Sequence, residues 1–243
     1  MSRLRGVGRL VHAALHALHG LVIVLLRFPS LNVAQRRRRV QWWSAKLLAA
    51  LGVRLQVHGS AHNGAALLVA NHVSWLDIAA IHAVAPHARF VSKADVKRWP
   101  LLNRLIDAGD TLYIERERSR DALRVVHQMA AALAAGDTVA IFPEGTTSDG
   151  AALLPFHANL LQAAVSTGAP VQPLVLRFSD ATHAVSLAVT FVGDTTLVGS
   201  LWNVACGDGL EVRVRLLPAL AGPHADRRSL ATQLHADIAA ALN

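Results

Sequence analysis

From residue 53 onward, short apolar runs alternate along the chain with amphipathic stretches. The amphipathic stretches cover residues 74–85, 120–135 and 156–167, and we predict that they are helices. The apolar runs have the length of strands and cover residues 54–58, 66–70, 88–92, 111–114, 138–142, 171–177, 184–191 and 210–216. Such alternation is typical of an α/β domain, which we place at residues 53–243.

The end of the chain predicts one more helix. Leu230, Leu234, Ile238 and Leu242 are spaced four apart, which places them on one face, and Ser229 can cap the helix at its amino end. We therefore expect a helix that buries this leucine-rich face.

The amino-terminal segment has a different pattern. Residues 10–26 are nearly all apolar and lie between Arg9 and Arg27. As a helix they would reach about 25 Å, slightly less than the roughly 30 Å core of a bilayer. His12, His16 and His19 recur on one face, and we interpret them as a polar stripe rather than a metal site. The pattern favours an interfacial or re-entrant helix at least as strongly as a full span.

A basic and aromatic segment follows at residues 36–51. Four consecutive arginines, Arg36–Arg39, precede Trp42, Trp43 and an apolar stretch. Four arginines alone would suggest a solvated helix face, but beside tryptophans they suit an anchor to anionic lipid. We therefore predict that residues 1–52 form a two-helix membrane-associated segment. We expect the protein at the cytoplasmic membrane, with its catalytic domain facing the cytoplasm.

Composition limits the possible partners. The chain has 243 residues, is 53% hydrophobic and carries a formal net charge of +8. This charge suits lipid headgroups, nucleic acid, or an acidic carrier or cofactor. We expect no nucleic acid partner, because no DNA- or RNA-binding motif occurs and the densest basic run adjoins the apolar segment. Cys206 is the only cysteine, which excludes an intramolecular disulfide and a cysteine-based zinc site.

Two titratable groups follow predicted strands. His72 comes after the run at 66–70, and Glu144 comes after the run at 138–142, so both lie at strand ends, where α/β proteins place their chemistry. If Ser74 caps the next helix, Asp77 can turn back towards His72, fix its tautomer and make it a general base. Taken alone, Ser74 and Asp77 would resemble a capping box, and His72 an ordinary hydrogen-bonded histidine.

The chain offers no nucleophile of its own beside these groups. No Gly-x-Ser-x-Gly occurs, and the only cysteine lies far from either strand end. A His–Asp pair would therefore activate a nucleophile that the substrate brings. This indicates either group transfer to an alcohol or hydrolysis.

Several motifs in order carry a resemblance to a known family. They are Asn71–Asp77 (NHVSWLD), Phe90–Ala94 (FVSKA), Tyr113–Arg116 (YIER), Phe142–Thr146 (FPEGT) and Ala169–Leu174 (APVQPL). Together they resemble the glycerolipid acyltransferase family, typified by 1-acylglycerol-3-phosphate acyltransferases, over residues 53–217. The resemblance implies a mixed β-sheet flanked by helices, like that of glycerol-3-phosphate acyltransferases.

The resemblance also implies roles. His72, oriented by Asp77, would deprotonate the free hydroxyl of a lysolipid, which then attacks an acyl thioester on coenzyme A or acyl carrier protein. Lys93 and Arg116 would hold the anionic headgroup. The other residues that the resemblance assigns to substrate binding are Asn71, Ser74, Glu144, Gly145 and Thr146. Such a transfer needs a base, an oxyanion donor and positioning, so we expect no metal and no bound cofactor.

Two departures from the family pattern bear on the acceptor. Thr147, Ser148 and Asp149 stand where many members that accept lysophosphatidic acid carry a basic residue, and Asp110 stands where a glycine is common. We expect both changes to make the headgroup site less positive. We predict 1-acylglycerol-3-phosphate as the first acceptor, with phosphatidate as product, and lyso-ornithine lipid or another lysophospholipid as the alternative. A thioesterase or lipid hydrolase is the more remote alternative.

Overall fold

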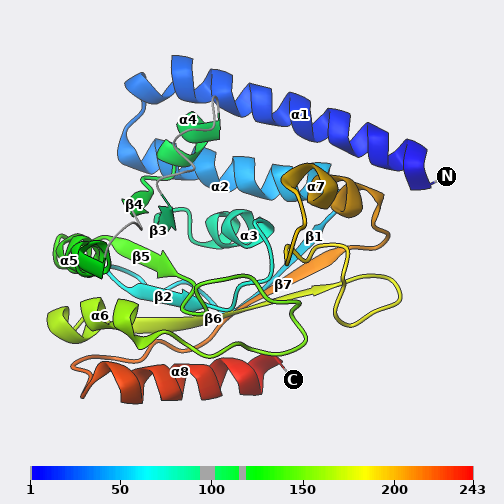
Figure 1. Ribbon diagram of the computed structural model, residues 1–243. Coiled ribbons are helices and arrows are strands. Elements are labelled where there is room, and N and C mark those ends of the chain that lie inside the picture. The colour runs from blue at the N-terminus through cyan, green and yellow to red at the C-terminus, as the bar shows by residue number, and fades with distance from the viewer. Residues whose placement is uncertain (1, 94–101, 115–118, 243) are drawn as a thin grey trace.

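A seven-stranded mixed sheet forms the centre of the molecule (Figure 1). The computed structural model describes residues 2–93, 102–114 and 119–242, and the sheet order within this part is β1-β7-β6-β2-β5-β3-β4. The strands are β1 (Arg54–His58), β2 (Leu67–Ala70), β3 (Ala88–Lys93), β4 (Leu112–Ile114), β5 (Thr138–Ile141), β6 (Val171–Ser179) and β7 (Glu211–Leu216). The α/β class and the mixed sheet are therefore confirmed.

The central strands are parallel and fully covered. β2 lies between β5 and β6 and pairs in parallel with both, and all residues of β2 and β5 are buried. Strands covered on both faces are continuously apolar, which explains why these two lack polar alternation. Because β2, β5 and β3 run in parallel, their carboxyl ends meet at one edge of the sheet. His72 and Glu144 both follow strands that end there.

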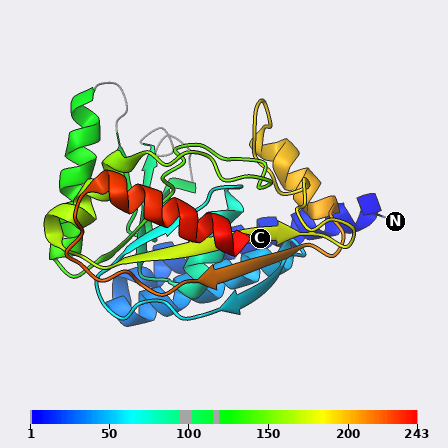
Figure 2. The same cartoon turned by 90° about the horizontal axis from the view of Figure 1, so that it is seen from below.

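Helices cover both faces of the sheet (Figures 1 and 2). One face carries α2 (Val33–Ala50), α3 (Leu76–Val84) and α7 (Leu197–Cys206), with α1 (Ser2–Leu26) lying across α2 and α7. The other face carries α5 (Ser119–Ala134), α6 (Gln162–Thr167) and α8 (Arg227–Leu242). The short α4 (Leu102–Asp107) contacts α1, and 3-10 turns occupy Phe28–Ser30 and Ala158–Leu161. Each face has its own apolar core.

The two predicted amino-terminal helices are present and differ in how deeply they pack. Asn32 and Gln35 cap α2 reciprocally, and α2 places Leu48 and Leu51 in the core without exposed surface. α1 is long and apolar enough to cross a membrane, by length and composition. It nevertheless lies along α2 and α7, where the His16 ring stacks on the Trp43 ring with 5.4 Å between the ring centroids. α2 is therefore part of the fold, while α1 covers it.

Three predictions of secondary structure need correction. Residues 184–191 form a loop rather than a strand, although Ser186 and Val189 are completely buried. α4 and α7 were not predicted. The last helix begins at Arg227, because the Asp226 carboxylate, rather than the Ser229 hydroxyl, accepts from the first backbone N–H groups. Its buried face of Leu230, Leu234 and Ile238 is as predicted.

Candidate active site

His72 and Asp77 form a hydrogen-bonded pair at the carboxyl end of β2. The distance between His72 Nδ1 and Asp77 Oδ2 is 2.7 Å. Asp77 lies in the first turn of α3 and has no exposed surface, whereas the His72 side chain is 19% exposed. Since a carboxylate only accepts, Nδ1 donates and the proton is on that nitrogen. The other ring nitrogen, Nε2, is left to act as a base.

Asp77 is held by the backbone of the turn that precedes α3. Its Oδ2 also accepts from the N–H groups of Val73 at 2.7 Å and Ser74 at 2.9 Å. The predicted cap is wrong in detail, because Trp75 occupies the N-cap position and Ser74 contributes its backbone N–H. Three donors on one oxygen fix the carboxylate, and with it the plane and direction of the imidazole. Asp77 Oδ1 is buried with no hydrogen-bond partner in the described part of the chain.

Phe142 covers one face of the imidazole. The His72 and Phe142 ring centroids are 4.0 Å apart with 10° between the ring planes, and Phe90 stacks on Phe142 at 5.8 Å. We had not assigned Phe142 to the site. The sequence contained a signal for it, since Phe142 begins the FPEGT motif, and the structure places β5 beside β2. The hydrogen bond to Asp77 holds the imidazole at its edge, and Phe142 restricts its motion on one face.

Glu144 joins two loops at the sheet edge. Its Oε1 accepts from the His72 backbone N–H at 2.6 Å, and its Oε2 accepts from the Leu154 N–H at 2.9 Å. The side chain is 3% exposed, and burial raises the pKa of Glu144, although these two N–H bonds oppose the shift. Glu144 thus ties the backbone at His72 to the backbone at Leu154.

The residues after Glu144 close a turn beneath the dyad. Gly145 has φ +70°, and a Cβ there would come within 3.0 Å of the His157 ring, so both conformation and space favour glycine. Ser148 donates its N–H to the His72 carbonyl at 2.8 Å, and the Thr147 hydroxyl donates to the Phe191 carbonyl. Thr146, which was assigned to substrate binding, is exposed at the turn. The polar residues at 147 and 148 therefore brace the loop.

Asn71 and Ser74 were assigned to substrate binding, but both side chains are buried, with exposed fractions of 2% and 0%. The Asn71 amide donates to the Leu176 carbonyl at 2.9 Å and accepts from the Leu176 N–H at 2.8 Å. This pair of hydrogen bonds ties the end of β2 to β6. In this conformation both residues support the site without lining an open surface.

The two predicted headgroup residues have different outcomes. Lys93 is the last residue of β3, and the parallel pairing of β3 with β5 places its backbone at the same sheet edge as His72. Arg116 lies outside the described residues. Binding of a headgroup by Lys93 and Arg116 stays a prediction.

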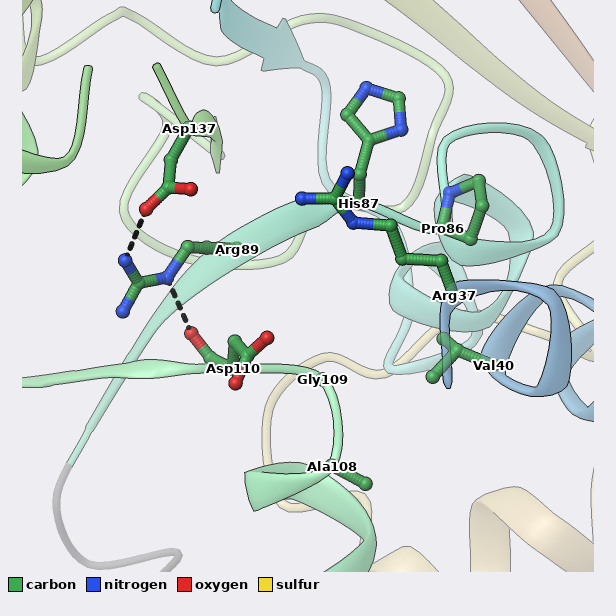
Figure 3. Close-up of a pocket in the computed structure, with 9 residues that line it drawn as sticks. All are labelled: Arg37, Val40, Pro86, His87, Arg89, Ala108, Gly109, Asp110 and Asp137. Carbon is green, nitrogen blue, oxygen red and sulfur yellow. Dashed lines mark hydrogen bonds and ion pairs between the residues drawn. The ribbon is translucent and has the colours of Figure 1, made fainter. Parts of the chain in front are cut away.

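Asp110 was expected near the headgroup, and the structure places it elsewhere. Its carbonyl accepts from Arg89 Nε at 3.0 Å, and Arg89 also pairs with Asp137 at 2.6 Å (Figure 3). Asp110 has φ +50°, the left-handed conformation that glycine adopts readily. It lines a cavity of about 250 Å³ whose other lining residues are Arg37, Val40, Pro86, His87, Arg89, Ala108, Gly109 and Asp137.

This cavity lies at the opposite end of the sheet from the dyad. Arg89 pairs with Val139, which pairs with Leu67, five residues before His72. Five residues span about 16 Å along a strand at about 3.3 Å per residue. The expectation that Asp110 lowers the positive charge at the headgroup site is therefore wrong.

The sheet, with its His–Asp pair at the carboxyl edge, matches a known class of enzyme. Residues 54–177 match the sequence model of the Acyltransferase family, and the chain belongs to this family. It is an O-acyltransferase.

Among known members, the chain is similar to two kinds of enzyme. It is 36% identical to a lyso-ornithine lipid O-acyltransferase of Pseudomonas aeruginosa, over 89% of this chain and 83% of that protein. It is also 36% identical to a 1-acyl-sn-glycerol-3-phosphate acyltransferase of Neisseria meningitidis, over 84% of this chain and 81% of that protein. The fold matches the crystal structure of the acyltransferase PlsC from Thermotoga maritima, with a TM-score of 0.68, 20% identity and 96% of each chain covered.

Proposed function

We propose that this enzyme transfers an acyl chain from a thioester to the free hydroxyl of a lysolipid, with His72 as general base and Asp77 as the residue that orients it. The observation that carries the proposal is the 2.7 Å hydrogen bond between the buried Asp77 carboxylate and His72 Nδ1. It leaves Nε2 with no partner among the described residues, on a side chain that keeps some exposure. A base that removes a substrate proton needs both features.

The steps follow from this geometry. Nε2 takes the hydroxyl proton as the lysolipid oxygen attacks the thioester carbonyl, and the Asp77 carboxylate stabilises the imidazolium that forms. The tetrahedral intermediate then expels the thiolate, which takes the proton back from Nε2. The products are an acylated lipid and a free thiol on coenzyme A or acyl carrier protein. These steps need a base, an oxyanion donor and positioning, so we propose no cofactor.

The backbone groups of the first motif are already engaged. The N–H groups of Val73 and Ser74 both donate to Asp77, so they are not available to an oxyanion. In the third motif, the Gly145 N–H donates to the Phe142 carbonyl and the Ser148 N–H to the His72 carbonyl. We therefore propose that the oxyanion donor lies between them, at the N–H groups of Thr146 or Thr147.

Two acceptors are supported. The relative from Neisseria meningitidis supports 1-acylglycerol-3-phosphate, and the position of Asp110 removes one of the two reasons for doubting it. The relative from Pseudomonas aeruginosa supports lyso-ornithine lipid. Position 147 also supports lyso-ornithine lipid. Many lysophosphatidate enzymes have a basic residue near this position, whereas here Thr147 donates its hydroxyl to the Phe191 carbonyl and brings no positive charge. We keep 1-acylglycerol-3-phosphate as the first acceptor and lyso-ornithine lipid as the second.

The enzyme associates with a membrane, and we propose that it does so through α1. A continuous row of exposed apolar side chains follows the outer side of this helix, while its inner side packs on α2 and α7. The row consists of Leu4, Val7, Val11, Leu15, Leu18, Val22 and Leu25, which are 44–82% exposed. A helix packed lengthwise on the body suits a position within the interface, with the catalytic domain at the cytoplasmic face.

An acceptor screen tests the function. Purified protein is given labelled acyl-coenzyme A or acyl carrier protein with lysophosphatidic acid, lyso-ornithine lipid or zwitterionic lysophospholipids, and His72→Ala serves as the blank. Labelled phosphatidate establishes the first acceptor, and label only in acylated ornithine lipid establishes the second. Thiol release that does not require any lysolipid would instead show a thioesterase and refute the proposal.

A further inference from the structure

Among the described residues, no helix covers the lower face of the sheet at β7 and β1 (Figure 2). α8 packs on β6, and Figure 2 shows β7 and β1 beside α8 without a helix drawn across them. On β7, Val212 and Val214 are buried in the core on the α2 and α3 side. Because side chains alternate along a strand, Arg213 and Arg215 project from the opposite, uncovered side.

The strand register gathers four arginines on this side, which we call the arginine face: Arg54, Arg177, Arg213 and Arg215. Arg177 lies directly across from Arg213 in the antiparallel pair of β6 and β7. Like charges in such a position destabilise a sheet. Glu211, the partner of Arg54 in the register, is 3.0 Å from Arg54 and 3.4 Å from Arg213.

The remaining contacts on the arginine face keep its charge positive. Arg177 and Arg215 donate to the carbonyls of Leu242 and Ala241 at the end of α8, and neither bond neutralises a guanidinium. Beside Arg177 and Arg213, a hollow of about 380 Å³ also contains Asp180, whose carboxylate pairs with His183 at 3.0 Å. Among the described residues, these four guanidinium groups thus outnumber the two carboxylates, Glu211 and Asp180, that lie beside them.

The arginine face lies at the same end of the sheet as the dyad. The two hydrogen bonds between Asn71 and Leu176 hold this part of β6 level with the start of the His72 loop. β7 is two strands away from β2, which corresponds to about 10 Å across the sheet. The arginine face is also on the opposite side of the sheet from α1, so it faces away from the proposed membrane surface (Figures 1 and 2).

We propose that the arginine face docks an acidic acyl carrier protein, which delivers the thioester to His72. The proposal rests on the proposed function, because it concerns the donor of that same transfer. The arginines are distributed over three strands, which suits several carboxylates on a protein surface better than one phosphate group. Their orientation away from α1 disfavours a lipid headgroup. Charge complementarity of this kind mainly increases the rate of association and is weakened by salt.

The test compares two donors that carry the same acyl chain, with the full-length protein in detergent micelles and saturating lysolipid. The test variant is Arg54→Gln with Arg213→Gln, since these side chains are 71% and 43% exposed and pair with Glu211. The control variant is Arg104→Gln with Arg228→Gln, which removes the same charge from exposed positions elsewhere.

We expect the test variant to raise the KM for acyl carrier protein about 5- to 10-fold, equivalent to about 1–1.4 kcal/mol. The KM for acyl-coenzyme A and both kcat values should change by less than about twofold, and 0.5 M salt should abolish the difference between the donors. An unchanged KM for the carrier, an equal change for both donors, or transfer from acyl-coenzyme A alone would overturn the docking proposal. Absence of transfer from either donor in the wild type would instead remove the proposed function itself.

Discussion

Replacing Phe142 tests whether the aromatic stack positions the base. Its ring lies parallel to the His72 imidazole, with 4.0 Å between centroids and 10° between planes. A stack of this kind contributes about 0.5–1.5 kcal/mol beyond the burial of area. If that energy holds the imidazole in its reactive orientation, its loss corresponds to about a 2- to 13-fold lower kcat, at about 1.36 kcal/mol per tenfold change in rate.

Phe142→Leu and Phe142→Tyr separate the stack from the filling of space. Leucine keeps an apolar side chain at Phe142 but cannot stack, whereas tyrosine keeps the ring. We expect kcat at saturating donor and acceptor to fall about 2- to 13-fold for leucine and by less than about twofold for tyrosine, with KM values unchanged. Thermal unfolding of each variant controls for the fold. Equal kcat in the leucine variant and the wild type would refute the reasoning, and an equal loss in both variants would show that the ring stack alone does not position the base.

Four further predictions follow from the same structure. His72→Ala should lower kcat at least about a hundredfold with an unchanged unfolding midpoint; near-normal turnover would exclude His72 as the base. Leu15→Glu with Val22→Glu on the exposed row of α1 should move the protein from the membrane to the soluble fraction, and unchanged sedimentation would argue against this row. His82 is buried, which lowers its pKa from 6.5 to about 4, so the unfolded state binds its proton first. His82 should therefore contribute about 3 kcal/mol of stability that is lost between pH 6.5 and pH 4, measured as the difference between urea titrations of the wild type and of His82→Gln; a difference that does not change with pH would contradict this. Burial raises the pKa of Glu144, so the folded state holds this proton longer, and the contribution of Glu144 to the unfolding free energy should decline as pH rises from the ordinary carboxyl range through that pKa. Glu144→Gln should abolish this decline, and a slope that persists would assign it to other groups.

The strands were predictable where burial and strand pairing coincide. β2 and β5 differ from their predicted bounds by one residue, because a run covered on both faces must be apolar throughout. β1 has the predicted bounds although none of its residues is buried. Residues 184–191 show the limit of that signal. Val189 is as buried as any strand residue, but the segment packs as a loop, and the bond from the Ser186 N–H to the Phe178 carbonyl of β6 at 3.0 Å is not continued into a ladder. An apolar pattern indicates burial but does not reveal whether the segment forms a ladder with a neighbouring strand.

The candidate site was predictable where it is local in sequence. His72 and Asp77 are five residues apart, so one turn brings them together. The roles of Phe142 and Glu144 depend on the pairing of β2 with β5, which no local pattern contains. Asp110 illustrates the opposite error. It is close in sequence to the YIER motif, but it precedes β4, which contains Tyr113 and Ile114 of that motif, so Asp110 lies at the amino end of this strand and away from the dyad.

Under the proposed function, the arrangement of charges and apolar surface would let one site serve a lipid acceptor and a water-soluble donor. The exposed row of α1 and the arginine face lie on opposite sides of the sheet, and His72 lies at the edge between them. An acceptor held in the membrane and a thioester delivered from water must meet at one base, so each needs its own approach. β6 links the two approaches, because it is tied to the His72 loop through Asn71 and carries Arg177 on its other face. On this reasoning, substitutions on the arginine face alter the use of the donor, and those on α1 alter access to the acceptor.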